Sequence, residues 1–333
     1  MTRFVHTALT LVFALLLSCT PQGKGTAPVR PEKEYDYKRG EDSFEYNPGG
    51  LFADRPVTVY TYIPETGDVT KMPILITLHG AERNGQNGII CWSEFAERDG
   101  FIVVSPEFSK SMYSENDYQF GGVTDPETHL LRPKAEWTYS IIEPLFDYIR
   151  EKTGNTSETY HLQGHSAGGQ FVHRFLLAVP DARVGTAVAC NPGSWTWVDP
   201  SGRIGETSDV FTWPYSVQGT PIADRNNLAS FFARKFYVCL GSLDTDTTDS
   251  SLPKDKASMC QGKYRLERGQ NFFAAAQKIA GSFGLPFSWE LSIVDGIGHQ
   301  GRGMVYGKKT GSSYSADNYS ETAAYYLIFG KEK

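Results

Sequence analysis

The stretch YHLQGHSAGGQFV, residues 160–172, is the most informative part of this 333-residue chain. It passes from a strand-like segment through GHSAG (164–168) into a segment of helical character. A G-x-S-x-G pattern between a strand and a helix is typical of a nucleophile elbow, a sharp turn that exposes the serine while its glycines let strand and helix approach closely. The stretch therefore predicts Ser166 as a nucleophile and the backbone N–H of Ala167 as one donor to a developing oxyanion.

A nucleophilic serine needs a base, and after such an elbow the acid comes next along the chain and the histidine last. Of the seven histidines, only His299 lies far enough beyond Ser166 to follow an acid. Asp244 stands in the turn after the apolar run FYVCLG (236–241), where an acid can reach a histidine at the same sheet edge. Asp244 is the predicted acid, and Asp246 is the alternative.

The turn after PILITLH (73–79) predicts the second oxyanion donor, the backbone N–H of Ala81, with that of Glu82 as the alternative. His79 precedes Ser166 in the chain, so we expect it to support the turn or position the substrate rather than act as the base. His165, beside the nucleophile, is also predicted to contact the substrate.

Two long segments, 107–136 and 191–221, carry Gly, Pro and aromatic residues and indicate binding loops or lids, with surface packing as the alternative. Trp195 in the second segment is predicted to bind substrate, because an aromatic face suits a sugar or phenolic ring; packing of the loop is the alternative. Arg265 and Arg268 are compatible with pairing to a substrate carboxylate or with ordinary ion pairs.

Outside the elbow, short apolar runs alternate with amphipathic stretches, which predicts an α/β fold with a mostly parallel central sheet and helices on both faces. The expected strands are 57–63, 73–79, 101–106, 158–163, 185–190, 236–241 and 287–294. The expected helices are 91–99, 137–152, 167–178, 222–233, 267–283 and 318–328.

Composition narrows the function classes. The chain carries 32 Lys and Arg against 38 Asp and Glu, a formal net charge of −6 with no basic block, so nucleic acid is not an expected partner. The acidic run DTDTTD (244–249) lacks the glycine and distal glutamate of a calcium-binding EF-hand loop, and no cysteine or histidine spacing suggests zinc. We therefore expect neither a metal nor a cofactor.

The first residues predict export. Residues 1–19 have an arginine near the start, an apolar core and a small residue before Cys19, as in a secretory signal peptide. The ending LLSC resembles the lipobox of bacterial lipoproteins, which makes Cys19 a candidate lipidation site; an ordinary signal peptide with a chance cysteine is the alternative. We expect a protein held at the cell envelope by a lipid anchor, at the outer membrane or in the periplasm, or otherwise secreted.

Residues 20–45, rich in Pro, Gly and charge, are predicted to form a flexible tether, and residues 46–333 a catalytic domain. Four further cysteines remain, at positions 91, 190, 239 and 260. Cys190 and Cys239 lie in strand-like apolar runs typical of free buried thiols. A Cys91–Cys260 disulfide is a hypothesis that an oxidising compartment would permit.

With these residues identified, the chain resembles the α/β-hydrolase superfamily over residues of roughly 50–330, and within it the secreted esterases grouped with poly(3-hydroxybutyrate) depolymerases and feruloyl or acetylxylan esterases. The stretches that carry the resemblance are LHGAERNG (78–85), FAERDGFIVVSPEF (95–108), YHLQGHSAGGQFVHRFL (160–176), NPGSW (191–195) and GIGHQG (296–301). The resemblance implies Ser166, His299 and Asp244 as the triad, in agreement with their order in the chain. The chain departs from the polymer depolymerases in having no recognisable substrate-binding module after the catalytic domain, and from many relatives in having Ala81 and Glu82 where they carry more glycine.

Three functional hypotheses follow. The first is a serine carboxylic-ester hydrolase that forms an acyl-enzyme, acting on esterified plant polysaccharide or related acyl esters and contacting membrane only through a lipid anchor. The second is a serine peptidase or amidase with the same triad. The third is a non-catalytic surface lipoprotein that binds glycan through its aromatic loops.

Overall fold

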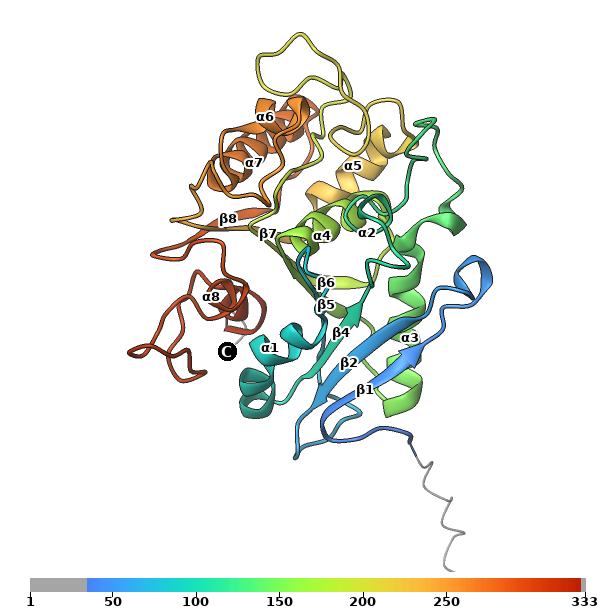
Figure 1. Ribbon diagram of the computed structural model, residues 1–333, viewed down its shortest axis with the longest axis vertical. Coiled ribbons are helices and arrows are strands. Elements are labelled where there is room, and N and C mark those ends of the chain that lie inside the picture. Colours follow the sequence, from blue (N-terminus) through green and yellow to red (C-terminus); the bar gives the residue numbers. More distant parts are fainter. Residues whose placement is uncertain (1–34, 331–333) are drawn as a thin grey trace, which may run out of the picture. The chain divides into compact units, whose positions relative to one another are not determined.

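The central sheet has eight strands in the order β1-β2-β4-β3-β5-β6-β7-β8 (Figure 1). The computed structural model describes residues 35–330. Strand β2 runs antiparallel to both of its neighbours, and the strands from β4 to β8 are mutually parallel. The strands are β1 (Gly40–Tyr46), β2 (Val57–Ile63), β3 (Ile74–Leu78), β4 (Ile102–Glu107), β5 (Tyr160–His165), β6 (Val184–Cys190), β7 (Lys235–Gly241) and β8 (Glu290–Val294).

The seven predicted strands are confirmed as β2 to β8, and so is the α/β fold class. The central strands form from near-continuous apolar runs because helices cover both faces of the sheet. All five residues of β3 are buried, and in β7 every residue after Lys235 is buried. Because β5, β7 and β8 are parallel, the residues that follow them emerge at one edge of the sheet.

The first strand corrects the predicted boundary between tether and domain. Residues 40–45 belong to β1, which pairs with β2 from Gly40 opposite Ile63 to Tyr46 opposite Val57, so the predicted tether of 20–45 is wrong at its end. The composition hid this strand because it lies at the sheet edge and alternates, with only Phe44 and Tyr46 as apolar residues turned inward. The rest of the tether up to residue 34, the signal segment 1–19 and Cys19 lie outside the described residues.

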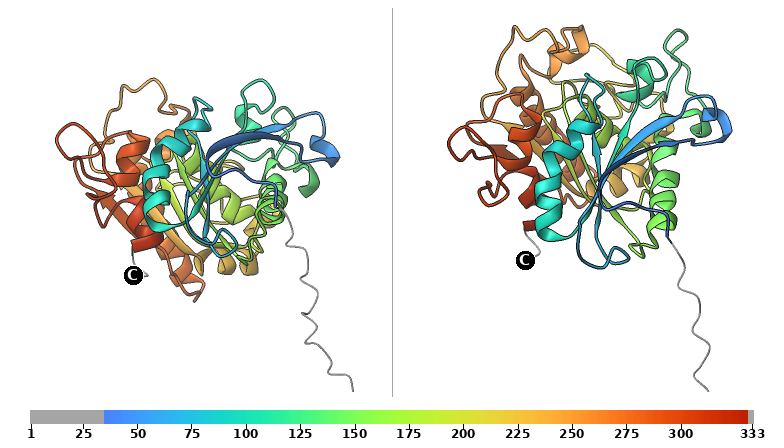
Figure 2. Two further views of the ribbon diagram at one scale, coloured as in Figure 1. Left: turned by 90° about the horizontal axis from the view of Figure 1, so that it is seen from below. Right: turned by 60° about the horizontal axis from the view of Figure 1, so that its bottom comes forward.

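Helices cover both faces of the sheet. One layer contains α3 (Ile142–Thr153), α4 (Ala167–Ala178), α5 (Arg225–Phe232) and α7 (Arg265–Ser282), which share one apolar core. The opposite layer contains α1 (Gln86–Asp99), α8 (Gly301–Tyr306) and the C-terminal segment, which share a second core. Figure 2 shows the C-terminal segment, in red, lying beside α1; there the ring of Tyr325 stacks on Phe95 with centroids 3.8 Å apart.

Five predicted helices are confirmed, and 318–328 is wrong. The predicted segments 137–152 and 222–233 each begin as a 3-10 turn, η3 (Thr138–Ile141) and η4 (Pro221–Ala223), before the α-helix. In 318–328 helical structure starts only at residue 324 and continues as the π-helix η5 (Tyr326–Gly330). The carbonyl of Thr322 accepts hydrogen bonds from Ser292 Oγ and Cys239 Sγ, which fastens this part of the chain as a turn against β7 and β8.

The first of the two long segments, 107–136, contains short elements of its own. It holds α2 (Glu115–Tyr118) and η2 (Lys134–Glu136), and the turn η1 (Gly50–Phe52) and the helix α6 (Lys256–Gln261) complete the described elements. Within residues 35–330, no helix combines the length and the apolar character that crossing a membrane requires.

Candidate active site

Ser166 stands in a tight turn between β5 and α4. Its backbone has φ 57° and ψ −116°, a conformation that few residues with a side chain adopt. The neighbouring glycines let the strands and the helix approach closely, because any side chain there would collide with backbone. A Cβ on Gly164 would lie 2.3 Å from the carbonyl oxygen of Gly168, and a Cβ on Gly168 would lie 2.1 Å from the carbonyl oxygen of Leu78. The predicted elbow is therefore present, with β3, β5 and α4 packed backbone against backbone around the serine.

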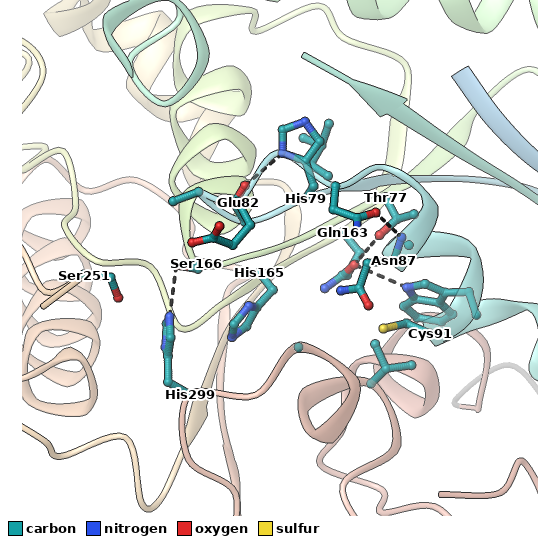
Figure 3. A pocket seen from close by; sticks show the side chains of 18 residues that line it. Thr77, His79, Glu82, Asn87, Cys91, Gln163, His165, Ser166, Ser251 and His299 are labelled. Carbon is teal, nitrogen blue, oxygen red and sulfur yellow. Dashed lines mark hydrogen bonds between the residues drawn. The ribbon is translucent and has the colours of Figure 1, made fainter. Parts of the chain in front are cut away.

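The side chains of Ser166, His299 and Asp244, which are assigned to the triad, are joined by successive hydrogen bonds, and Figure 3 shows the bond between Ser166 and His299. His299 Nε2 lies 3.0 Å from Ser166 Oγ, and His299 Nδ1 lies 2.7 Å from Asp244 Oδ2. Ser166 follows β5, Asp244 follows β7 and His299 follows β8, so the parallel strand ends bring them together. A carboxylate on Nδ1 leaves Nε2 free to accept the proton of the serine hydroxyl, which is the arrangement that activates serine.

Asp244, and not Asp246, faces the histidine. Asp244 is buried at 3% exposure, and its other oxygen lies 3.4 Å from the guanidinium of Arg265. Asp246 is exposed, and its carboxylate accepts hydrogen bonds from the backbone N–H and hydroxyl of Thr248. The two acids therefore do different work: one holds the imidazole and the other closes a surface turn.

Asn191 is a functional residue that the sequence pattern did not reveal. Its side-chain carbonyl accepts a hydrogen bond from Gly241 N–H, and its amide donates to the carbonyl of Gly298. It thereby joins the end of β7 to the residue before His299. Asn191 has φ 47°, and asparagine is among the side chains that best tolerate that region, so an asparagine directly after a predicted strand was the available signal.

The predicted oxyanion donors face the serine from two sides. Ala167 is the first residue of α4, so its N–H has no acceptor one turn earlier in the helix. Ala81 follows β3 in a turn that passes Ser166, since a Cβ on Gly80 would lie 3.7 Å from Ser166 Cβ. Within residues 35–330 the Ala81 N–H donates to no protein group. Both residues line one cavity with Ser166, as donors to an oxyanion there would have to, and their role stays a prediction.

His79 is a buried neutral support of that turn. Its Nε2 accepts a hydrogen bond from Phe108 N–H, its Nδ1 donates to the carbonyl of Gly80, and its ring stacks on Tyr118 with centroids 4.5 Å apart. Burial is the largest effect and, aided by the charge of Arg83 and opposed by the hydrogen bond to the Gly80 carbonyl, lowers the pKa of His79 to about 3. Of the two predicted roles, this geometry matches the structural one.

His165 lies beside the site without a protein partner for Nε2. Its ring centroid is 4.6 Å from that of His299, and among the described residues its buried Nε2 has no hydrogen-bond partner. Burial, with smaller effects from His299 and Arg265, lowers the pKa of His165 well below its usual range, so the ring is neutral. A substrate contact remains a prediction for this residue.

Trp195 is buried and does not line the site, so its predicted role in substrate binding is wrong. Its exposure is 0%, and its ring stacks on Phe272 of α7 with centroids 4.4 Å apart. Trp197 and Trp213 are buried as well. The aromatic residues of the segment 191–221 therefore pack the loop onto the body, which was the alternative.

Arg265 and Arg268 are buried and engaged within the protein, so neither is placed to meet a substrate carboxylate. Arg265 contacts Asp244, Asp249 at 2.8 Å and Ser251 Oγ at 2.8 Å. Arg268 donates to three backbone carbonyls. These arginines instead fix the loops that surround the triad.

Two cavities meet at Ser166. The first, about 260 Å³, extends past His165 toward α1 and includes His299 among its lining residues. The second, about 300 Å³, extends toward α2 and is lined by Ala81 and Ala167, by Gln170, and by Lys110 and neighbouring residues of the segment 107–136. The segment 107–136 therefore lines the site, which agrees with its interpretation as a binding loop and not with surface packing alone.

The cysteines of the described residues are all free, so the Cys91–Cys260 disulfide hypothesis is wrong. Cys91 belongs to the core on the α1 face of the sheet, whereas Cys260 packs against the core on the opposite face. Burial raises the pKa of the Cys91 thiol to about 12, so it is inert as a nucleophile. Within residues 35–330, no group of three or more His, Cys, Asp or Glu side chains is arranged to hold a metal ion.

Solved structures of other proteins resemble this chain in both sequence and fold. No family model matches the sequence, and neither does any curated protein. Among solved structures, poly(aspartic acid) hydrolase-1 from Sphingomonas sp. KT-1 is 34% identical with a TM-score of 0.73, over 80% of this chain and 96% of that one. LpqC, a poly(3-hydroxybutyrate) depolymerase from Bordetella parapertussis, is 31% identical with a TM-score of 0.72, over 80% of this chain and 88% of that one. The similarity spans most of each chain and is one of sequence as well as fold.

Proposed function

Because this chain belongs to the α/β-hydrolase superfamily, among hydrolases similar to poly(3-hydroxybutyrate) depolymerase, we propose that it is a serine carboxylic-ester hydrolase. The observation that carries the proposal is the hydrogen-bonded chain from Ser166 Oγ through His299 to Asp244. Ala81 and Ala167, whose backbone N–H groups we assign to the oxyanion, line one cavity with Ser166.

The reaction follows from this geometry. Ser166 Oγ attacks the ester carbonyl while His299 Nε2 takes its proton, and Asp244 stabilises the imidazolium that forms. The N–H groups of Ala81 and Ala167 donate to the oxyanion of the tetrahedral intermediate. His299 then gives its proton to the leaving alcohol, and an acyl group remains on Ser166. Water, deprotonated by His299, attacks that acyl group and releases the acid.

The test is hydrolysis of p-nitrophenyl acetate and butyrate, methyl ferulate and acetylated xylan by the full chain, with Ser166→Ala as the control. We expect the variant to lose roughly 10⁴-fold or more in kcat, because nothing else supplies the attacking oxygen. The panel also ranks the acyl preference, including the esterified plant polysaccharide that we propose as a substrate class. A folded wild type that hydrolyses none of these esters, or a variant that remains active, contradicts the proposal.

A serine amidase is the second candidate, because poly(aspartic acid), named in the first comparison, is a polymer joined by amide bonds. The same triad can act on either bond, and the amide differs in needing full protonation of its leaving nitrogen. Rates on p-nitrophenyl acetate and p-nitroacetanilide, which share an acyl group, separate the two. The glycan-binding hypothesis loses its support, since the tryptophans on which it relied are buried.

We also propose attachment to the cell envelope through a lipid on Cys19, on the strength of the signal-like residues 1–19. Export would then bring the enzyme to substrates outside the cytoplasm. Incorporation of a labelled fatty acid, present in the wild type and absent in Cys19→Ser, tests the anchor. Equal labelling of both proteins, or of neither, contradicts it.

A further inference from the structure

The first cavity, on the His299 side of Ser166, has an inner part that the proposed triad does not use. Figure 3 shows the ring of His165 between the Ser166–His299 pair and a second group of polar side chains, Gln163 and Asn87. These belong to the end of β5 and the start of α1. Any role of this inner part in choosing a substrate rests on the proposed function, because it requires Ser166 to be the nucleophile.

The position of His299 assigns a role to each cavity. The proton for the leaving alcohol comes from His299 Nε2, so the leaving oxygen must lie within hydrogen-bond reach of that atom. Among the described residues, His299 lines the first cavity and does not line the second. The leaving group therefore occupies the first cavity, and the acyl chain extends into the second.

The inner part of the first cavity offers hydrogen-bonding groups that the protein leaves unused. His165 Nε2 is buried without a partner, and no protein group hydrogen-bonds the Asn87 carboxamide within residues 35–330. Gln163 is buried at 2% exposure; its oxygen accepts from Thr77 Oγ1 at 2.7 Å and from Trp92 Nε1 at 3.4 Å, whereas its Nε2 donates to the sulfur of Cys190, a weak acceptor, at 3.6 Å. Buried polar groups are normally satisfied, so His165 Nε2 and the weakly engaged amide of Gln163 indicate a polar ligand. The Asn87 carboxamide is exposed and lines the same cavity, where it can hydrogen-bond that ligand.

The charged residues around the cavity further restrict the class of ligand that it can bind. Glu82 is the carboxylate among its lining residues, and no lysine or arginine lines it within the described chain. An anionic leaving group would be repelled there and would find no cation. We infer that the first cavity is a leaving-group subsite for a neutral alcohol that carries further hydroxyl groups, such as a polyol or a sugar, and that Asn87 and Gln163 recognise those hydroxyls.

The acyl-enzyme provides a direct test, because an added alcohol must enter the leaving-group subsite to react. Its oxygen attacks the acyl carbon on Ser166, its proton passes to His299 and then to Ser166 Oγ, and a new ester is released. The full chain is acylated with p-nitrophenyl acetate in the presence of glycerol or 1-propanol. The ratio of new ester to free acetate is measured for each alcohol.

We expect wild type to transfer acetyl to glycerol in preference to 1-propanol at equal concentration. Asn87→Leu keeps the side-chain size, removes its hydrogen bonds and lies at an exposed position, so it should reduce that preference about five- to tenfold. The release of p-nitrophenol without added alcohol is measured alongside, so that the ratio of products is compared between proteins that form the acyl-enzyme. Lys110→Ala, at an exposed residue of the second cavity, should leave the preference as in wild type.

Each other outcome overturns the inference. No preference for glycerol in the wild type, or an unchanged preference in Asn87→Leu, shows that the subsite does not recognise hydroxyls. An equal loss in Lys110→Ala shows that the alcohol does not enter the first cavity. These results leave the esterase intact, whereas a folded wild type that releases no p-nitrophenol at all contradicts the proposed function itself.

Discussion

Asp244 and Asp246 are two residues apart, yet the site makes use of one. Asp244 is buried against His299, whereas Asp246 accepts hydrogen bonds within its own turn. An asparagine at position 244 would favour the imidazole tautomer with the proton on Nε2, which cannot accept the proton of Ser166.

Asp244→Asn should therefore lower kcat by about 10³- to 10⁴-fold, while the matched variant Asp246→Asn should stay within about twofold of wild type. Steady-state hydrolysis of p-nitrophenyl acetate measures both, and circular dichroism checks that each variant is folded. Comparable losses in the two variants would mean that the acid has been assigned to the wrong residue.

The sequence could locate the triad positions because chain order and strand ends restrict them. Ser166 lay in a recognisable turn, and His299 was the histidine late enough in the chain. It could not place Trp195, because an aromatic residue in a loop suits packing and binding equally well, and burial decides between them. It also could not show Asn191, whose role depends on two loops that meet only in the folded chain.

At the scale of elements, the elbow depends on how closely β3, β5 and α4 approach. A methyl group on Gly168 would lie 2.1 Å from a backbone carbonyl oxygen, and backbone cannot move aside as a side chain can. Gly281, near the end of α7, has open space around its Cβ position and no positive φ.

Gly168→Ala should lower the free energy of unfolding by at least about 2 kcal/mol and reduce activity, since overpacking there displaces the serine. Gly281→Ala should raise the free energy of unfolding by about 0.5–1 kcal/mol, because alanine is the better helix former. Urea titrations of both variants make the comparison. A Gly168→Ala variant as stable as wild type would show that the turn can widen.

The elements that the sequence predicted are those with strong apolar runs. Seven strands and five helices followed from periodicity, because burial between two layers demands continuous apolar segments. The edge strand β1 was missed because only two of its residues face the core. The helix predicted for 318–328 was wrong because the buried residues of this segment have a spacing that resembles that of a helix. Side chains of β7 and β8 donate hydrogen bonds to the carbonyl of Thr322 and hold a turn there instead.

For the whole molecule, the buried neutral histidines make stability depend on pH. Burial lowers the pKa of His79 to about 3, and burial with the nearby charge of Arg174 lowers the pKa of His173 well below its usual range. In the unfolded chain these rings have a pKa of about 6.5. Below that pH the unfolded state binds protons that the folded state does not, so stability is present above pH 6.5 and is lost as the pH falls.

The free energy of unfolding should fall by up to about 1.4 kcal/mol per pH unit for each such histidine below pH 6.5. Guanidinium titrations between about pH 6.5 and 5.5 measure the slope, above the range where most carboxylates titrate. His173→Gln should flatten it, whereas His129→Gln, at an exposed position, should not. A wild type whose stability is constant over this range would contradict the neutral, buried state of these rings.

The proposed function depends on Ser166 being a nucleophile activated by His299 and Asp244. A fluorophosphonate tests it most directly, because an activated serine displaces fluoride and forms a stable bond to phosphorus. Mass spectrometry of the digested full-length protein should find one adduct, on the peptide that contains Ser166, and labelling should be slower by about 100-fold or more in His299→Ala. A folded protein that takes up no label, or takes it up at another residue, would contradict the account.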